Sequence, residues 1–133
     1  QIVMKVEDVM IEMGKFPAVT QNTILKEALT EMGEANLGLV CIINNKQELL
    51  GLITDGDLRR KLLKVQKPFS AFFVDDALVH AKEDPITCQP GENLKEVVKL
   101  MGDKQIWDLP VVNQDNQLVG LLHLHPAIKK LIN

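Results

Sequence analysis

Apolar residues recur along this chain in two periods, and each period occurs twice. In residues 25–32 and again in 94–101 they stand at i, i+3, i+4 and i+7, the spacing that makes one apolar face of a helix. Elsewhere the apolar runs are almost continuous, as in strands covered on both faces. These runs are residues 39–43, 49–53, 109–112 and 118–122. Polar turns at 44–47 and 113–116 join them in pairs, so the pattern predicts a helix followed by a hairpin, twice.

The two halves of the sequence also match residue by residue. When the sequence is aligned with itself, Val6 matches Val74 and Pro17 matches Pro85 at one offset. After a single inserted residue, Leu25-Lys26-Glu27 matches Leu94-Lys95-Glu96 and Gly51 matches Gly120. Matches along the whole length indicate an internal duplication. We therefore divide the chain into repeat one (residues 3–64), a connector (65–73) and repeat two (74–133).

Each repeat is expected to contain the same elements. A short opening segment, at 6–10 or 74–79, leads to Pro17-Ala18-Val19 or Pro85-Ile86-Thr87, where we expect a brief edge strand. The helix, the hairpin and a closing helix follow. The order β-α-β-β-α, twice, is an α+β fold, and strands buried on both faces favour repeats packed sheet to sheet with helices outside.

The starts of the two main helices differ in sequence. Asn93-x-x-Glu96 has the spacing of a helix capping motif. Repeat one has Ile24 at the matching position, so its helix must rely on Thr23 for a cap.

The stretch Leu50–Arg60 passes from an apolar strand into a helical pattern without a spacer. Thr54-x-x-Asp57 has the spacing of a capping box, which predicts strand, tight turn and helix in succession. At this turn the first N–H groups of the helix are expected to lie beside the polar side chains of Thr54, Asp55 and Asp57. Arg59, Arg60 and Lys61 follow one helical turn later. Two interpretations are open: the corner holds a phosphorylated ligand, or these residues only cap the helix and complement its C-terminal end.

Composition excludes several classes of protein. The 133 residues are 46% hydrophobic and 25% charged, which suits one compact domain or two small units. A net charge of −3 disfavours nucleic-acid binding. No apolar run approaches the ~18 residues of a membrane span, and the first residues lack a signal-peptide pattern.

Two further features bear on where the protein is located and on whether the chain is part of a longer protein. Cys41 and Cys88 have no CxxC spacing, so they are interpreted as reduced packing thiols of a cytoplasmic protein. Because the chain starts at Gln1, we expect it to be a piece of a longer protein.

Three motifs and the order of elements resemble a tandem cystathionine-β-synthase (CBS) domain pair, or Bateman module. The motifs are Val6-Glu7-Asp8-Val9-Met10, Gly51-Leu52-Ile53-Thr54-Asp55-Gly56-Asp57 and Leu109-Pro110-Val111-Val112-Asn113. In that family they open the repeat, bind ligand and end a strand, respectively. The resemblance covers the whole chain and implies two β-α-β-β-α repeats related by pseudo-two-fold symmetry.

A narrower resemblance is to the C-terminal CBS pair of arabinose 5-phosphate isomerases, which serve Kdo, and hence lipopolysaccharide or capsule, synthesis. It rests on Leu37-Gly38, on Thr54-Asp55-Gly56-Asp57-Leu58-Arg59-Arg60 and on Gly120-Leu121-Leu122-His123-Leu124-His125. It implies a sugar-phosphate isomerase domain before Gln1. The Thr54–Arg60 string also occurs in CBS pairs attached to sugar nucleotidyltransferases, so that alternative stays open.

The CBS resemblance assigns roles at the Thr54 corner. Thr54 corresponds to the residue that contacts ligand phosphate, and Asp57 to the one that binds ribose hydroxyls. A carboxylate can accept two hydrogen bonds from a vicinal diol. The resemblance places the base between Pro17-Ala18-Val19 and Gly38-Leu39. Asp55, Arg59 and Arg60 complete the expected binding residues of repeat one.

Repeat two departs from the motif, because His123 stands in place of Thr54 and Pro126 in place of Asp57. A ribose grip like that of repeat one is therefore not expected there. His123 and His125, on one strand, would share a face and could begin a metal site, but the chain offers no clear third ligand. We interpret them as polar contacts to an anionic ligand, with helix capping as the alternative. Trp107, which matches Gly38, stacks on a base or packs in a core or interface.

The sequence contains no nucleophile–base arrangement or phosphate loop with a supporting context, so no catalysis is expected in this chain. It predicts a regulatory module that senses a nucleotide or nucleotide-sugar, such as CMP-Kdo, without cofactor or metal. We expect a homodimer, tetrameric in the parent protein, with no nucleic-acid or membrane partner. Two alternatives are an adenine-nucleotide sensor attached to another enzyme or transporter, and an oligomerisation module that binds nothing.

Overall fold

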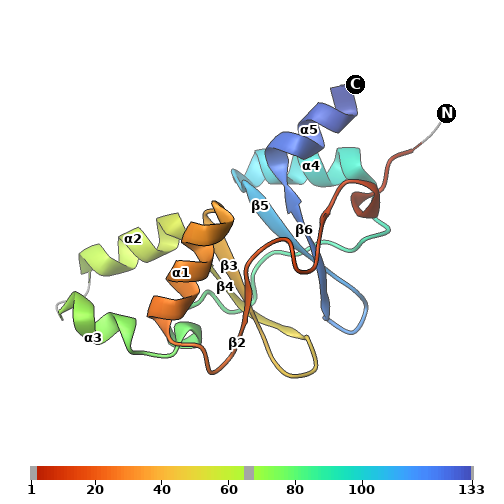
Figure 1. Ribbon diagram of the computed structural model, residues 1–133. Coiled ribbons are helices and arrows are strands. Elements are labelled where there is room, and N and C mark those ends of the chain that lie inside the picture. The colour runs from red at the N-terminus through yellow and green to blue at the C-terminus, as the bar shows by residue number, and fades with distance from the viewer. Residues whose placement is uncertain (1–2, 65–67, 133) are drawn as a thin grey trace. The chain divides into compact units, whose positions relative to one another are not determined.

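The computed structural model describes residues 3–64 and 68–132, and its chain folds into two compact units (Figure 1). The middle unit is Phe16–Pro85. The terminal unit joins the segment up to Lys15 to the segment from Ile86 onward. Each unit holds one three-stranded sheet together with helices, so the predicted α+β class is confirmed.

The middle unit has the strand order β2-β3-β4, with β2 parallel and β4 antiparallel to β3. Its elements are β2 (Ala18–Thr20), α1 (Leu25–Ala35), β3 (Leu39–Ile43), β4 (Leu49–Thr54), α2 (Asp55–Lys64), α3 (Phe69–Phe73) and the 3-10 helix η2 (Ala77–His80). Both hairpin strands are largely buried, as their continuous apolar sequence predicts.

The terminal unit has the strand order β1-β6-β5, with antiparallel pairing throughout. Its elements are the 3-10 helix η1 (Val6–Asp8), β1 (Ile11–Glu12), α4 (Leu94–Lys104), β5 (Asp108–Val112), β6 (Leu118–His123) and α5 (Leu124–Ile132). No helix in residues 3–64 or 68–132 is long and apolar enough to cross a membrane.

The hairpin turns of the two units match atom by atom. Asn44 Oδ1 accepts hydrogen bonds from the Lys46 and Glu48 amides, both at 2.9 Å. Asn113 Oδ1 does the same for the amides of Asp115 and Gln117, at 2.9 and 3.0 Å. The internal duplication read from the sequence is therefore also a duplication of hydrogen bonds.

Of the two predicted N-terminal caps, that of α4 is correct and that of α1 is wrong. The Asn93 side chain accepts the Glu96 amide at 3.3 Å and caps α4 as predicted. Thr23 does not cap α1: the N-cap position is Ile24, and the Thr23 hydroxyl lies 3.2 Å from that of Thr20. The Leu25 amide donates to the Asp75 carbonyl at 2.8 Å, as the matching Leu94 amide of α4 does to the Met4 carbonyl at 2.8 Å. A distant segment thus contacts the first turn of both helices, and only α4 has a side-chain cap in addition.

Each unit takes one segment from the opening of the other repeat. In the terminal unit β1, from repeat one, pairs with β6. In the middle unit the residues after η2, from the start of repeat two, reach β4, where Leu52 and Lys82 exchange backbone hydrogen bonds of 3.1 and 2.8 Å. The two sheets are thus completed by exchanged segments.

Gly51 and Gly120 stand where the exchanged segments cross the closing strands. A Cβ at Gly51 would lie 2.9 Å from Ala81 Cβ, and one at Gly120 would lie 3.0 Å from the Ile11 carbonyl oxygen. The first separation is shorter than ordinary Cβ contacts and the second is at their lower limit, so a side chain at either position would force its neighbours to move. Glycine at these two matching positions therefore permits the crossing.

Two expected elements differ from the structure. Pro85-Ile86-Thr87 is not a strand; its neighbour Cys88 forms only an isolated parallel bridge to Val111. The predicted connector contains the helix α3, whose Phe72 is 1% exposed and belongs to the core of the middle unit.

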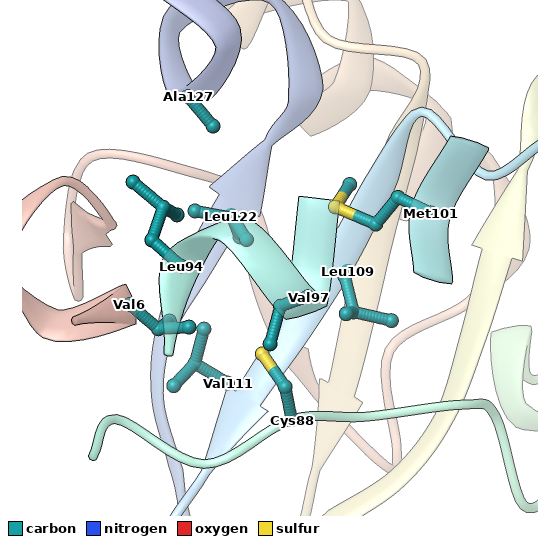
Figure 2. Close-up of a cluster of buried hydrophobic side chains, with 9 residues drawn as sticks. All are labelled: Val6, Cys88, Leu94, Val97, Met101, Leu109, Val111, Leu122 and Ala127. Atoms are coloured by element: carbon teal, nitrogen blue, oxygen red, sulfur yellow. The ribbon is translucent and has the colours of Figure 1, made fainter. Parts of the chain in front are cut away.

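Each unit has its own core. In the terminal unit, Figure 2 shows the apolar face of α4 against β5 and β6, with Ala127 coming from α5. The buried residues are Val6, Cys88, Leu94, Val97, Met101, Leu109, Val111, Leu122 and Ala127. The matching cluster of the middle unit is Val19, Leu25, Ala28, Met32, Val40, Ile42, Ile53, Phe72 and Ala77. The periodic positions of both predicted helices, Leu25, Ala28 and Met32 in α1 and Leu94, Val97 and Met101 in α4, lie in these cores.

Candidate ligand-binding site

Strand β4 runs directly into helix α2 at Thr54–Asp57, a turn that we name the β4–α2 corner. Thr54 Oγ1 accepts the Asp57 amide at 3.2 Å, which is the predicted N-terminal cap. The Asp55 amide donates to the Gly38 carbonyl at 2.9 Å and so ties the corner to the start of β3. These two hydrogen bonds fix the backbone of the corner, and its side chains are exposed to different degrees.

The charged side chains of the corner form an ion pair within one turn of α2. Arg60 Nη2 donates to Asp57 Oδ1 at 2.5 Å, and the two side chains are 60% and 40% exposed. The guanidinium lies over Gly56, since a Cβ there would be 3.3 Å from Arg60 Nη1. A carboxylate and a guanidinium are therefore both accessible to a solute at the start of the helix.

The sheet brings the other predicted residues of repeat one to the same end. The Pro17 carbonyl accepts the Cys41 amide at 3.0 Å, and Leu39 is paired with Thr54. Because β2 is parallel and β4 antiparallel to β3, the starts of β2 and β3 and the end of β4 share one edge. The three segments that the sequence analysis assigned to one site therefore lie at the same end of the sheet.

Burial limits what these residues can offer to a ligand. Pro17, Val19 and Leu39 are buried, so only their backbone or an edge of the side chain is reachable without movement. Ala18 is half-buried and Gly38 is exposed. Of the residues predicted to lie around the base, three therefore belong to the core, and two small ones are accessible at least in part.

A hollow of about 430 Å³ adjoins the corner at Gly38 and Asp55. Its lining residues are Leu29, Met32, Gly33, Asn36, Leu37, Gly38 and Asp55. Gly38 leaves room for the Asp55 carboxylate, whose Oδ2 lies 3.0 Å from the place of a Gly38 Cβ. The α1 side of this hollow was not predicted from the sequence. The residue that could have indicated it is Asn36, which ends α1 in the left-handed conformation (φ 57°) and turns the chain toward Gly38.

The basic residues of α2 differ in their surroundings. Arg59 is exposed. Lys61 Nζ donates to the Val79 carbonyl at 3.4 Å and is thus directed at η2. Lys64 lies at the far end of the helix, and Lys67 lies outside the described residues. Arg60 is the basic residue that contacts the corner itself.

The matching corner of the terminal unit, where β6 meets α5, has a different chemistry. The Leu124 amide donates to the Trp107 carbonyl at 2.9 Å, as Asp55 does to Gly38. His123, in the place of Thr54, is hydrogen-bonded through Nδ1 to Asp108 Oδ1 at 2.6 Å. Burial raises the pKa of Asp108 above its ordinary value of 3.8, and the hydrogen bond and charge of His123 offset part of this rise. Trp107 is 71% exposed, so it is not a core residue.

The expectation for the two histidines is corrected. His123 ends β6 and His125 lies in the first turn of α5, so they do not share one face of a strand. Helix α5 begins directly after His123, and Pro126 fits its first turn. In residues 3–64 and 68–132, no group of three His, Cys, Asp or Glu side chains could hold a metal ion.

The predicted site residues are divided between the units. Those of repeat one, from Pro17 to Arg60, lie in the middle unit, and His123 and His125 lie in the terminal unit. The middle unit alone therefore supplies a carboxylate, a guanidinium, a helix N-terminus and a hollow beside one another.

Comparisons with known proteins agree on the kind of domain. The family model described as "CBS domain" matches residues 6–64 and 74–125. Arabinose 5-phosphate isomerase KdsD of Pseudomonas aeruginosa is 33% identical over 129 residues, which are 97% of this chain and 38% of that protein. The KdsD protein of Escherichia coli is 28% identical over 129 residues, with the same shares. The chain thus spans well under half the length of these relatives.

Similar solved structures share the fold. CBSX2 in complex with AMP has a TM-score of 0.83 at 23% identity, with 96% of each chain covered. The CBS domain pair of protein MJ0100, in complex with 5′-methylthioadenosine and S-adenosyl-L-methionine, has a TM-score of 0.77 at 21% identity, with 98% of this chain and 97% of that chain covered.

Proposed function

The chain belongs to the CBS domain family, and on this premise we propose that it is a regulatory module whose β4–α2 corner binds a nucleotide or nucleotide-sugar. The observation that carries the proposal is the surface position of Asp57 and Arg60 at the start of α2. A carboxylate can accept both hydroxyls of a ribose diol, while a helix N-terminus and a guanidinium favour phosphate. Binding there would bias the arrangement of the pair and so the activity of an attached catalytic domain.

We propose a sugar-phosphate isomerase as the parent protein, with CMP-Kdo as a candidate end-product ligand. The support is the identity to two arabinose 5-phosphate isomerases over nearly all of this chain. The test is an aldose–ketose isomerase assay of the full-length protein with arabinose 5-phosphate, with and without CMP-Kdo. A full-length protein without isomerase activity would contradict this parent.

An adenine nucleotide is the second candidate ligand. It is favoured by the similarity in fold to CBS structures solved with AMP and with adenosine derivatives. A thermal-shift panel distinguishes the candidates: CMP, CMP-Kdo, CMP-sialic acid, AMP, ADP, ATP, GTP and arabinose 5-phosphate. A ligand at 100 times its dissociation constant adds about 2.7 kcal/mol of stability, or several degrees. No shift with any compound would contradict ligand sensing and favour an oligomerisation module.

Asp57→Ala tests the position of the site. We expect it to abolish most of the shift given by the ligand that stabilises the wild type, because the diol loses its acceptor. Thr54 still caps α2 in this variant, so the fold is retained. Asp103→Ala, an exposed carboxylate of α4, is the matched control and should leave the shift unchanged. An unchanged affinity for every nucleotide in Asp57→Ala would contradict the proposed site.

We also propose a cytoplasmic homodimer. Helices α4 and α5 pack together and leave Leu100, Ile128 and Ile132 exposed at 36%, 40% and 77%. Exposed apolar side chains on neighbouring helices suit a surface covered by another copy. Sedimentation equilibrium checks this state, and a monomer at micromolar concentration would contradict it.

A further inference from the structure

Arg60 reaches the β4–α2 corner although its backbone stands one turn inside α2. Gly56 lets the guanidinium lie close to the backbone, because a Cβ there would be 3.3 and 3.5 Å from its two terminal nitrogens. The side chain folds back over Gly56 and donates to Asp57 Oδ1 at 2.5 Å. Helical i, i+3 spacing and this bond thus hold the guanidinium beside the carboxylate that is expected to bind the diol.

This contact has a consequence for ligands. Each carboxylate oxygen can accept more than one hydrogen bond, and Arg60 already donates to Oδ1. A vicinal diol that uses both oxygens of Asp57 therefore competes with Arg60 at Oδ1. A neutral nucleoside gives the released guanidinium no new partner. A nucleotide offers its phosphate, which forms a stronger charge-assisted and often bidentate bond with arginine.

We propose that Arg60 is a specificity-determining residue that exchanges Asp57 for the ligand's phosphate, and so makes the site select ligands that combine a vicinal diol with a phosphate. The inference rests on the proposed nucleotide-binding function of the corner. It concerns Arg60 and not α2 as a whole, because Lys61 is directed at the Val79 carbonyl and Lys64 stands at the opposite end of the helix.

The test is isothermal titration calorimetry on the whole chain with two pairs of probes, AMP with adenosine and CMP with cytidine. For the pair that binds, we expect the wild type to prefer the nucleotide by about tenfold or more. In Arg60→Gln the nucleotide should bind about tenfold more weakly and the nucleoside as tightly as before or more tightly, so the preference falls close to one. Lys64→Gln removes the same charge from the same helix and should keep the preference.

Arg60→Lys is the second variant, because it keeps the charge and loses the planar fork; it should retain part of the preference. A preference that is unchanged in Arg60→Gln, or equal weakening of nucleotide and nucleoside, would overturn the inference while the proposed function stands. If the wild type binds none of the four probes, the inference fails, and the thermal-shift panel decides separately whether the proposed function stands.

Discussion

Single side chains distinguish the two corners where a closing strand meets its helix. Thr54 and Asp57 present a hydroxyl and an accessible carboxylate, whereas His123 engages the partly buried Asp108. The first pair can accept hydrogen bonds from a ligand. In the terminal unit Pro126 stands in the place of Asp57, so the diol acceptor of the motif is missing there.

The burial of Asp108 predicts a dependence of stability on pH. Its pKa is raised in the folded state, so the folded chain binds a proton more tightly than the unfolded chain does. The stabilisation is fully present below the ordinary value of 3.8 and is lost as the pH rises through the raised pKa. The free energy of unfolding of the wild type, minus that of Asp108→Asn, should therefore fall as the pH rises across this window.

Urea denaturation from pH 3.5 to pH 7, followed by circular dichroism, measures this difference. Asp115→Asn in the turn between β5 and β6 is the control, since this carboxylate belongs to an exposed residue. A difference that rises with pH would show that the bond to His123, and not burial, dominates at Asp108.

Among the secondary-structure elements, the two main helices share a pattern and differ in their first residues. Asn93 caps α4 with its side chain, and the start of α1 has no side-chain cap. Asn93→Ala should lower the free energy of unfolding by about 1 kcal/mol, because the Glu96 amide loses its acceptor. Thr23→Ala should change it by clearly less. Urea titrations of both variants check this, and equal losses would mean that Thr23 does contribute a cap.

The elements that local pattern can specify were predicted from sequence. The apolar faces of α1 and α4, the four hairpin strands and the Thr54 cap follow from short-range spacing. The exchanged strand β1 has two residues, and its pairing with β6 depends on a segment more than 100 positions away. The helix α3 is stabilised by the burial of Phe72 in the core of the middle unit. Neither could be predicted, because tertiary contacts and not local propensity determine them.

The same limit applies to the candidate site. The motif identified Thr54, Asp57 and Arg60 as neighbours in sequence, and helical spacing brings the last two into contact. The hollow beside Gly38 depends on how α1 ends against the start of β3, which no local signal of repeat one specified except Asn36.

For the molecule as a whole, the exchanged segments define a matched pair of tests at glycine. Gly51→Ala places a Cβ 2.9 Å from Ala81 Cβ, and we expect a loss of about 1–3 kcal/mol as the segment after η2 is pushed from β4. Gly33→Ala, inside α1 with no atom within 4 Å of the new Cβ, should raise stability by up to about 1 kcal/mol. Thermal unfolding of the two variants should shift in opposite directions. A neutral Gly51→Ala would mean that the crossing segment is not held against β4.

The exchange of opening segments also bears on how such a gene can change. A deletion that removed either repeat would take away a strand or bridging segment that the remaining sheet needs. A side chain gained at Gly51 or Gly120 in one repeat would be opposed by residues encoded in the other. After the duplication, neither copy could be lost or freely altered at its crossing point. The two copies are therefore retained together, although the corners where each closing strand meets its helix differ in sequence.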